Sequence, residues 1–551
     1  MKYLKLFLIV FASSTCYAQS YKITYQRSYH GTVIEDQDPI WLFAHDNGAW
    51  LTSEGMVNGS ATFPFEETFV DLNKGSFIQV AQLNTNQKTA LLDSLSLGKQ
   101  QFELTGETKK ILGYSCQKAK TIINSNTIEL WFTQDLPVKG APTVLGQSLG
   151  LVLEMIRNGN FVIAATKVEK LKQLPKGAIP PSISLVSALA YRDLLWNSRF
   201  TTLKVFKNEK VHFSGEAVSN DSILRFANGT VILKKVQFPE IKAGNHIFVE
   251  LREQSEGDAY DRTGSIFLIP QGKNLSFMNG LQNGMGTLPL YENGNGKKYQ
   301  GVVATETYEP VLELMRFFTP FGIKHYNHIE LKGKTWHEQV SFRQEISELY
   351  SALSGQELWV GAFIGNYDAG GYRISLDITI HPGEGMTIPA SQVIPLFNTT
   401  NIMEMGGQEY GTMFNVEKGL EVSFELLKPL KNARLRYITT GHGGWSGGDE
   451  FVPKVNSVYL NQNKIHAFTP WRQDCGSYRL YNPASGNFNN GLSSSDYSRS
   501  NWCPGTVTNP VYIDLGDLPS GKHTLRVHIP QGAPEGSSFS AWNVSGVLLG
   551  E

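Results

Sequence analysis

Alternating hydrophobic and polar residues recur in short stretches along most of the chain. This pattern is typical of β-strands with one buried face. The clearest stretches are residues 22–27, 121–132, 202–206, 246–251, 265–269, 358–364, 373–380, 392–396, 434–439, 455–460, 511–515 and 523–528. Turns rich in Gly, Asn and Pro separate many of them, and irregular loops between short strands favour antiparallel sandwiches over parallel α/β units. The chain is therefore predicted to be mainly β.

Helical spacing of apolar residues is rare. It predicts helices at residues 146–158, 186–195, 310–318 and 341–353. A Pro-rich stretch, residues 174–182, interrupts the pattern after the first of these, as linkers do. We therefore predict a separate N-terminal α+β domain over residues 19–172 and a linker over residues 173–190. A second boundary is expected at residues 381–385, which contain Pro and Gly.

The first 18 residues have the composition of a secretory signal. Lys2 and Lys5 supply a positive start, residues 6–12 are apolar, and small residues precede Gln19. A signal over residues 1–18 predicts a secreted or periplasmic protein.

Composition narrows the function classes. Of the 551 residues, 41% are hydrophobic and 18% are charged, which excludes a disordered chain. The net charge of -1 argues against a nucleic-acid partner. Beyond the N-terminus, no apolar stretch approaches the ~20 residues that a membrane span needs. The sequence has no His-Glu-x-x-His, paired Cys-x-x-Cys or Asp-rich calcium loop, so neither a metal nor another cofactor is expected.

Three cysteines, Cys116, Cys475 and Cys503, remain once the signal is removed. Export permits disulfides, and the odd number means that one thiol stays free or pairs elsewhere. Cys116 is expected to be a small buried residue rather than a nucleophile, because no papain-like Cys/His spacing accompanies it.

Four short motifs occur in order in the C-terminal half. They are Tyr260-Asp261-Arg262 before a strand, Leu435-Arg436 before a Gly-rich loop and Glu450, Cys475-Gly476, and Arg499-x-x-Trp502-Cys503-Pro504-Gly505. With these motifs, residues of about 195–551 resemble the peptide-N-glycosidase F family, whose members remove N-linked glycans from asparagine. Each motif is weak alone, but the shared order makes the resemblance specific.

The resemblance implies a fold and an activity. The fold would be two side-by-side, eight-stranded antiparallel jelly-roll β-sandwiches over residues 191–385 and 386–551, with the active site at their interface. The enzyme would be a peptide-N4-(N-acetyl-β-glucosaminyl)asparagine amidase. It would act, as a monomer, on N-glycosylated proteins and glycopeptides, giving aspartate and a glycosylamine. A disulfide would join Cys475 to Cys503. Residues 109–119 and 140–154 resemble the GLPGLI family, which implies a lineage but no activity.

Hydrolysis of a glycosyl amide needs groups that donate and accept protons, and two carboxyls with separated pKa values can do both. The resemblance implies that Asp261 contacts the sugar–asparagine bond, as nucleophile or base, and that Glu450 reaches the same groove from the other lobe. Two alternatives stay open. Without its motif, Asp261 would be a surface carboxylate paired with Arg262. Asp449 also precedes Glu450, so the second acid is ambiguous by one position.

The same resemblance assigns substrate contacts. Aromatic faces stack on the apolar faces of sugars, and polar groups around them bind the hydroxyls. The residues expected to bind the glycan are Tyr260, Arg262, His442, Arg499 and Trp502. For Trp502, a core position beside the disulfide is the alternative.

The chain departs from the family pattern at two positions. Phe363 aligns with the family's third carboxylate, and Gly365 aligns with a Trp that contacts sugar. Asp368, in the loop that follows, is an alternative source of a carboxylate. We expect this departure to affect glycan preference more than the reaction itself.

Two other classes of function stay open. An endo-acting glycosidase on the same glycans would also use two carboxylates, but at a sugar–sugar bond. A jelly roll can also bind carbohydrate at a cell surface without cleaving it. Two acids on separate lobes favour an enzyme.

Overall fold

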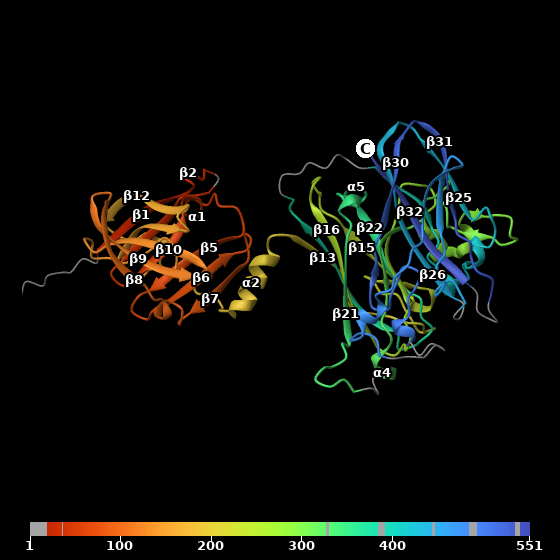
Figure 1. The fold of residues 1–551 in the computed structure, drawn as a ribbon, viewed down its shortest axis with the longest axis horizontal. Helices are drawn as coiled ribbons and strands as arrows, with labels where there is room; N and C mark the ends of the chain where they lie inside the picture. Colours follow the sequence, from red (N-terminus) through yellow and green to blue (C-terminus); the bar gives the residue numbers. More distant parts are fainter. Residues whose placement is uncertain are drawn as a thin grey trace, which may run out of the picture. The chain divides into compact units, whose positions relative to one another are not determined.

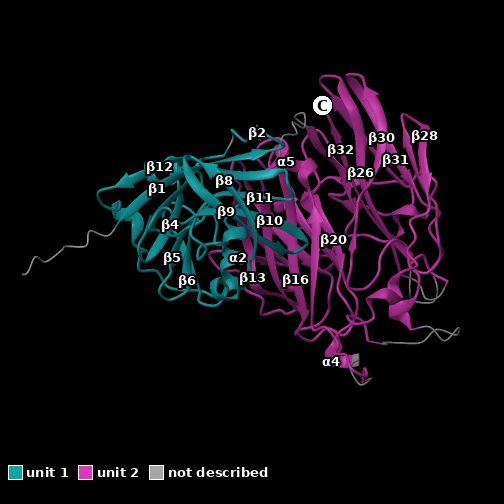
Figure 2. Ribbon diagram, turned by 60° about the vertical axis from the view of Figure 1, so that its left-hand side comes forward, with its two compact units in different colours: residues 1–199 teal, residues 200–551 magenta. Residues whose placement is uncertain are grey.

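The computed structural model describes residues 19–35, 37–326, 330–383, 392–443, 447–483, 493–534 and 540–551. The chain divides into two compact units, Met1–Arg199 and Phe200–Glu551, which Figure 2 colours separately. The signal predicted for residues 1–18 lies outside the described residues, as do residues 384–391 at the predicted second boundary. Among the described residues, no helix is long and apolar enough to cross a membrane.

Unit 1 is built on one antiparallel sheet of twelve strands, drawn in red to orange in Figure 1. The order across the sheet is β7 (Lys88–Asp93), β6 (Ser76–Gln82), β5 (Phe65–Asp71), β4 (Gly48–Ser53), β3 (Ile40–His45), β1 (Ser20–Tyr29), β12 (Phe161–Leu171), β11 (Leu151–Arg157), β10 (Asn126–Thr133), β9 (Tyr114–Ile123) and β8 (Glu103–Ile111), with β2 (Thr32–Val33) paired to β1. Two helices accompany the sheet, α1 (Glu54–Asn58) and α2 (Ala188–Asn197). Alternate residues of β1, such as Ile23 and Tyr25, are fully buried in the core.

The helix predicted at residues 146–158 is wrong. Most of this stretch is the strand β11, which pairs with β10 and β12 inside the sheet. The first three residues of the strand, Leu151, Val152 and Leu153, are all fully buried. A strand with apolar residues on both faces loses its alternation, and a short apolar run cannot be told from a helix by periodicity.

The segment predicted as a linker, residues 173–190, packs against unit 1. Leu174 contacts the buried aromatic cluster that contains Trp50. The helix α2 then buries Tyr191, whose hydroxyl donates a hydrogen bond to Glu66 at 2.7 Å. This segment therefore belongs to the first compact unit, which ends later than the domain boundary predicted from the sequence.

The first half of unit 2 is a sandwich of two antiparallel sheets. One has the order β13 (Thr201–Val211), β23 (Tyr372–His381), β16 (His246–Ser255) and β21 (Gln339–Glu345). The other has the order β14 (Leu224–Phe226), β15 (Val231–Gln237), β22 (Glu357–Ile364), β17 (Thr263–Ile269), β20 (Leu312–Phe318) and β29 (Val507–Thr508). Buried residues of both sheets, among them Val249 of β16 and Ile266 of β17, form one core.

The second half of unit 2 is another antiparallel sandwich. One sheet has the order β24 (Gln392–Asn398), β32 (Ser540–Gly550), β26 (Leu430–Gly443) and β30 (Val511–Leu518). The other has the order β25 (Leu420–Leu426), β31 (Gly521–His528), β27 (Asn456–Leu460) and β28 (Asn463–Phe468). Leu435 of β26 and Val422 of β25 meet in its core. The smaller elements of unit 2 are β18 (Leu290–Tyr291), β19 (Tyr299–Gln300), α3 (Phe277–Asn283), α4 (Ile323–Tyr326) and α5 (Tyr350–Leu353). The predicted fold of mainly antiparallel β-sandwiches is confirmed.

Two helices predicted in this unit need correction. Residues 310–318 contain the strand β20, in which all seven residues are buried. Residues 341–353 begin in the strand β21, and only their second half is helical, as a 3-10 turn (Ser347–Leu349) that continues into α5. In β20 both faces are buried, and its two charged residues, Glu313 and Arg316, are three positions apart, so the sequence shows no strand alternation. The helix predicted at residues 186–195 is confirmed as α2, two residues further along.

A buried ion-pair network joins the two sandwiches. Arg316 of β20 is fully buried, and its Nη2 lies 2.7 Å from Oε2 of Glu313. Nη1 of Arg316 donates to the carbonyl oxygen of Asn543 in β32, and Ser545 of β32 donates to Glu313 at 2.6 Å. Buried charges persist only when they are paired and hydrogen-bonded. The network therefore holds β20 of the first sandwich against β32 of the second.

Candidate active site

Asp261 lies in the loop that joins β16 to β17, and hydrogen bonds hold this loop on both sides. The Tyr372 hydroxyl donates to the carbonyl oxygen of Tyr260 at 2.7 Å. The amide of Arg262 donates to Oγ1 of Thr319 at 2.8 Å. The backbone around Asp261 is therefore fixed by contacts to neighbouring strands, and its carboxylate has a defined position.

The two adjacent acids after β26 have different surroundings. Asp449 is fully buried, and its carboxylate accepts hydrogen bonds from Nε1 of Trp542 at 2.8 Å and from the amide of Gly532 at 3.0 Å. Glu450 instead forms an ion pair with Arg499. The geometry places Glu450, and not Asp449, with the other site residues, and Asp449 holds the surrounding backbone.

Arg499 lies between the two predicted acids. Its Nη1 is 3.0 Å from Oδ2 of Asp261 and also contacts the Glu450 carboxylate. Nη2 donates to the carbonyl oxygen of Ser494 at 2.7 Å, and only 1% of the Arg499 side chain is exposed. The contact with Asp261 is an ion pair without hydrogen-bond alignment, so Oδ2 keeps its capacity to accept a hydrogen bond. One cation thus serves two carboxylates from different sandwiches.

Burial is the main influence on both acids. Burial raises the pKa of Glu450, Arg499 lowers it and the Asp261 charge raises it, and together they put this pKa at about 7. Burial also raises the pKa of Asp261, against the lowering effect of Arg499 and Arg262. Two coupled carboxyls beside one cation can hold a single proton near neutral pH. Such a pair can donate one proton and accept another.

Trp502 lies against Arg499, next to the disulfide. The bond between Cys475 and Cys503 is present, as the resemblance implied. Trp502 is 3% exposed, its ring stacks on Phe318 with centroids 4.3 Å apart, and the Arg499 guanidinium lies 4.3 Å from its centroid. The sugar-stacking role predicted for Trp502 therefore needs correction, because the ring is covered. Trp502 supports Arg499 from within the core.

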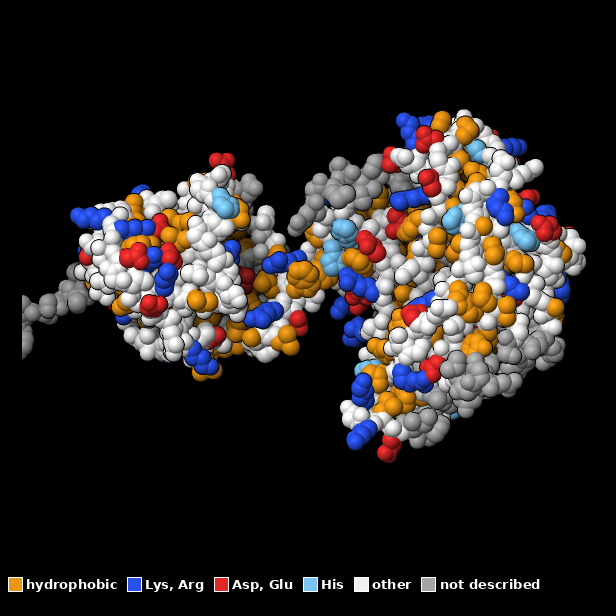
Figure 3. Space-filling model, in the orientation of Figure 1, with side chains coloured by type: hydrophobic (Ala, Val, Ile, Leu, Met, Phe, Trp, Pro, Cys, Tyr) orange, Lys and Arg blue, Asp and Glu red, His pale blue; other side chains and the backbone are white. Residues whose placement is uncertain are grey.

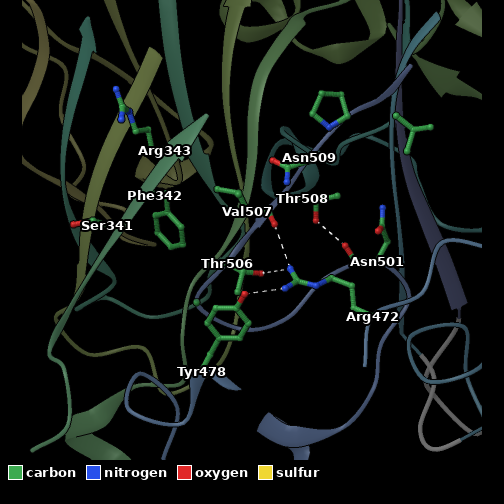
Figure 4. A pocket seen from close by; sticks show the side chains of 13 residues that line it. Ser341, Phe342, Arg343, Arg472, Tyr478, Asn501, Thr506, Val507, Thr508 and Asn509 are labelled. Atoms are coloured by element: carbon green, nitrogen blue, oxygen red, sulfur yellow. Dashed lines mark hydrogen bonds between the residues drawn. The ribbon is translucent and has the colours of Figure 1, made fainter. Parts of the chain in front are cut away.

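A cavity of about 510 Å³ in unit 2 surrounds Arg472 (Figure 4). Nη1 of Arg472 donates to Oγ1 of Thr506 at 2.9 Å, and Nη2 lies 2.7 Å from the Asp474 carboxylate. The backbone of Arg472 also exchanges two hydrogen bonds with that of Arg499, at 2.8 and 3.0 Å. The Arg472 guanidinium is thus engaged by the protein itself, and its strand-like pairing positions Arg499.

Asp261 lines a second cavity, of about 420 Å³, together with Arg262, Phe363, Gly365 and His442. Burial and then the neighbouring guanidinium groups lower the pKa of His442 to about 3, so this imidazole is neutral at physiological pH. Gly365 carries no side chain into the space, and Phe363 supplies an apolar wall. This cavity is the place where a molecule can approach Asp261.

Family models match most of the chain. The model of the N-glycanase peptide N-terminal domain matches residues 23–193, and those of the peptide-N-glycosidase F N-terminal and C-terminal domains match residues 202–380 and 409–549. Two solved structures of PNGF-II, in space groups C2 and P21, are 57% identical to this chain and cover 97% of it and 98% and 99% of their own chains, with TM-scores of 0.91 and 0.92. This chain belongs to the peptide-N-glycosidase F family.

Other comparisons add less. PNGase F, a glycosylasparaginase from Flavobacterium meningosepticum, is 14% identical over 64% of this chain and 96% of its own, with a TM-score of 0.42, which is too low to carry an argument. No curated protein matches the sequence. Within the described residues, no group of three or more His, Cys, Asp or Glu side chains is placed to hold a metal ion.

Arg262 and Tyr260, which the sequence predicts to bind the glycan in this family member, are the neighbours of Asp261 in the chain. Arg262 lines the cavity and forms a two-pronged contact with Asp258, at 2.8 and 3.1 Å. Asp261 is therefore not a surface carboxylate held by Arg262, which was the alternative. Tyr260 is 54% exposed and is not among the residues that line the cavity, although its ring lies 5.3 Å from the Arg262 guanidinium.

The cavity of this family member also contains an acid that the sequence analysis missed. Asp368, the expected substitute for a third carboxylate, accepts hydrogen bonds from the amide of Gly370 and holds its own loop. Glu404 instead lines the cavity, where the hydroxyls of Tyr367 and Tyr410 donate to its carboxylate. No motif contains Glu404, and its loop has no periodicity, so nothing in the sequence links it to Asp261.

Proposed function

We propose that this member of the peptide-N-glycosidase F family is an amidase that removes N-linked glycans from glycoproteins and glycopeptides. It would cleave the amide between asparagine and the first GlcNAc, giving aspartate and a glycosylamine. The observation that carries this proposal is the pair of largely buried acids, Asp261 and Glu450, which share Arg499 beside a cavity that Asp261 lines.

The proposed reaction uses one ionised and one protonated carboxyl. Asp261 accepts a proton from water as the water oxygen attacks the amide carbonyl carbon. Glu450 gives its proton to the asparagine nitrogen as the carbon–nitrogen bond breaks. The two acids thereby exchange protonation states, and Arg499 keeps the charge of the pair balanced throughout. The raised pKa of Glu450, about 7, supports its role as the acid.

Isosteric substitutions test these roles. We expect Asp261→Asn and Glu450→Gln each to lower kcat on a small glycopeptide by roughly 10²–10⁴-fold, because each removes a proton-transfer group while keeping its shape. Glu409→Gln, which changes an acid outside the cavity, is the matched control and should leave kcat unchanged. A correctly folded Asp261→Asn protein with near wild-type turnover would refute the proposal.

Product analysis separates the amidase from the other classes. In water enriched in ¹⁸O, an amidase converts asparagine to aspartate and places the label in the peptide. A glycosidase leaves a GlcNAc on asparagine and places the label in the released sugar, and a binding protein changes no mass. Mass spectrometry of the peptide distinguishes the three outcomes.

We also propose that the protein acts as a monomer outside the cytoplasm, in the periplasm or secreted. Two features support export: the signal-like residues 1–18, and the disulfide between Cys475 and Cys503, which forms and persists in oxidising compartments. Cell fractionation with N-terminal sequencing tests export, and a mature protein that begins at Gln19 is expected. Sedimentation of the purified protein tests the monomer.

A further inference from the structure

A carboxylate and two phenols form a compact cluster in the cavity that Asp261 lines. Glu404 begins the 3-10 turn Glu404–Gly406, in the loop between β24 and β25 of the second sandwich. Tyr410 lies in the same loop, and Tyr367 comes from the loop between β22 and β23 of the first sandwich. All three line the cavity. The cluster therefore spans the two sandwiches, as the pair of acids does.

The hydrogen bonds of this cluster leave an acceptor unused. Oε1 of Glu404 accepts from the Tyr367 hydroxyl at 2.8 Å and from the Tyr410 hydroxyl at 2.5 Å. Oε2 has no hydrogen bond within the described part of the chain. Burial and then the Glu404 carboxylate raise the pKa of Tyr367 to about 12, and the same influences raise the pKa of Tyr410. Both phenols therefore stay protonated and hold Glu404 in place as donors.

Aromatic side chains lie in the same region as the unused acceptor, Oε2 of Glu404. The Arg262 guanidinium lies 5.3 Å from the Tyr260 ring and 5.5 Å from the Tyr367 ring, and Asp258 holds the guanidinium from the other end. Tyr260 and Tyr367 are 54% and 53% exposed as whole residues. A fixed carboxylate next to the exposed ring of Tyr367 in the same cavity matches the chemistry of a pyranose, which has apolar faces and a rim of hydroxyl groups.

We propose that Glu404, Tyr367 and Tyr410 form a sugar-binding subsite, in which the carboxylate accepts a hydrogen bond from a hydroxyl of the GlcNAc-containing core of the glycan. This rests on the proposed function for the identity of the glycan. The subsite orients the sugar so that its bond to asparagine lies at Asp261. Glu404 is a specificity-determining residue and takes no part in the proton transfers.

Binding of a free sugar tests the subsite without any reaction. The probe is the β-1,4-linked disaccharide of GlcNAc, titrated into the full-length protein by calorimetry. We expect Glu404→Gln to weaken binding about tenfold, because an acceptor charge is lost from a hydrogen bond. Tyr367→Phe, at a half-exposed position where folding is not at risk, should also weaken binding. Glu409→Gln, on the same loop but paired with Lys297 at 3.5 Å, is the matched control and should bind as the wild type does.

Kinetics on a glycopeptide supply the second readout. For Glu404→Gln we expect KM to rise about tenfold while kcat changes by less than about threefold. Loss of kcat at unchanged KM would overturn the subsite and place Glu404 in the chemistry. Wild-type affinity in both Glu404→Gln and Tyr367→Phe, or no affinity of the wild type for the disaccharide, would also overturn it. Sugar binding that depends on Glu404 in a protein with no amidase activity would uphold the subsite and refute the proposed function.

Discussion

Among single residues, Arg499 has the widest effect on the site, because two buried acids depend on it. It lowers the pKa of both Asp261 and Glu450, while burial raises them. The balance leaves the pKa of Glu450 at about 7. Small changes in pH near neutrality therefore change the number of protons that the pair holds.

This balance predicts a pH dependence. If protonated Glu450 is the acid, kcat/KM on a small glycopeptide should fall as pH rises above about 7, since the acid has then lost its proton. Initial rates measured from pH 5 to pH 9 provide the test, with enzyme stability checked at each pH. A rate that is flat from pH 6 to pH 9 would contradict the role of Glu450.

A second residue predicts a pH dependence of stability. Glu253 of β16 is fully buried, and neither carboxylate oxygen has a hydrogen-bond partner within the described residues. Burial raises its pKa well above the ordinary value. The native state thus keeps a proton that the unfolded state loses above about pH 4.3. Wild-type stability should therefore fall as pH rises from there toward the native pKa, by about 1.4 kcal/mol per pH unit from this group.

The variant Glu253→Gln removes this titration while keeping the shape of the side chain. We expect its free energy of unfolding to match the wild type near pH 4 and to exceed it by a margin that grows as pH rises toward the native pKa of Glu253. Urea unfolding at several pH values measures the margin. Glu250→Gln, an exposed acid on the same strand, should show no such trend, and a constant difference for Glu253→Gln would refute the raised pKa.

At the scale of elements, the strand β20 carries the contacts that join the sandwiches. Arg316→Met should destabilise unit 2 by about 3–5 kcal/mol, because it leaves the buried Glu313 carboxylate without its cation. Arg343→Met breaks an exposed pair with Glu250 on a neighbouring strand and should cost no more than about 1 kcal/mol. Replacing Arg316 and Glu313 together by Met and Leu should recover much of the loss. Equal effects of the two single variants would contradict this account.

On the scale of the whole molecule, the described site residues all lie in unit 2. We expect a protein without residues 19–199 to keep kcat/KM on a small glycopeptide within about threefold, because unit 2 has its own cores. The deletion ends at residue 199, after α2, because α2 packs on unit 1. Kinetics of the full-length and shortened proteins on a glycopeptide and on a bulky glycoprotein provide the test, with a change in KM expected for the glycoprotein. A soluble, folded unit 2 without activity on the glycopeptide would show that unit 1 is needed for catalysis.

Charged side chains of both signs occur on the surface of each unit (Figure 3). On the face shown in Figure 3, Lys and Arg side chains are interspersed with Asp and Glu side chains. This agrees with the net charge of -1. If the proposed subsite is correct, we expect glycan binding in the cavity to depend on local groups such as Glu404 and Tyr367 rather than on long-range attraction.

The sequence by itself determined the β architecture, the order of the motifs and the identity of Asp261 and Glu450 as candidates. Strand alternation is a local property, so it can be recognised wherever one face is polar. It failed at β11 and β20, where apolar residues occupy both faces and the few charged residues do not alternate with them. The end of unit 1 was placed too early for a different reason: the Pro-rich stretch has the composition of a linker, and its packing against unit 1 is a tertiary contact.

Only the tertiary structure decided which of these candidates meet. Asp449 and Glu450 are neighbours in sequence, but their side chains have different partners, and that choice depends on Trp542 and Arg499 from distant segments. Burial of Trp502 and the approach of Glu404 to the cavity depend equally on contacts between the sandwiches. Such contacts join residues far apart in the chain, and the local pattern around each residue carries no information about its partner in space.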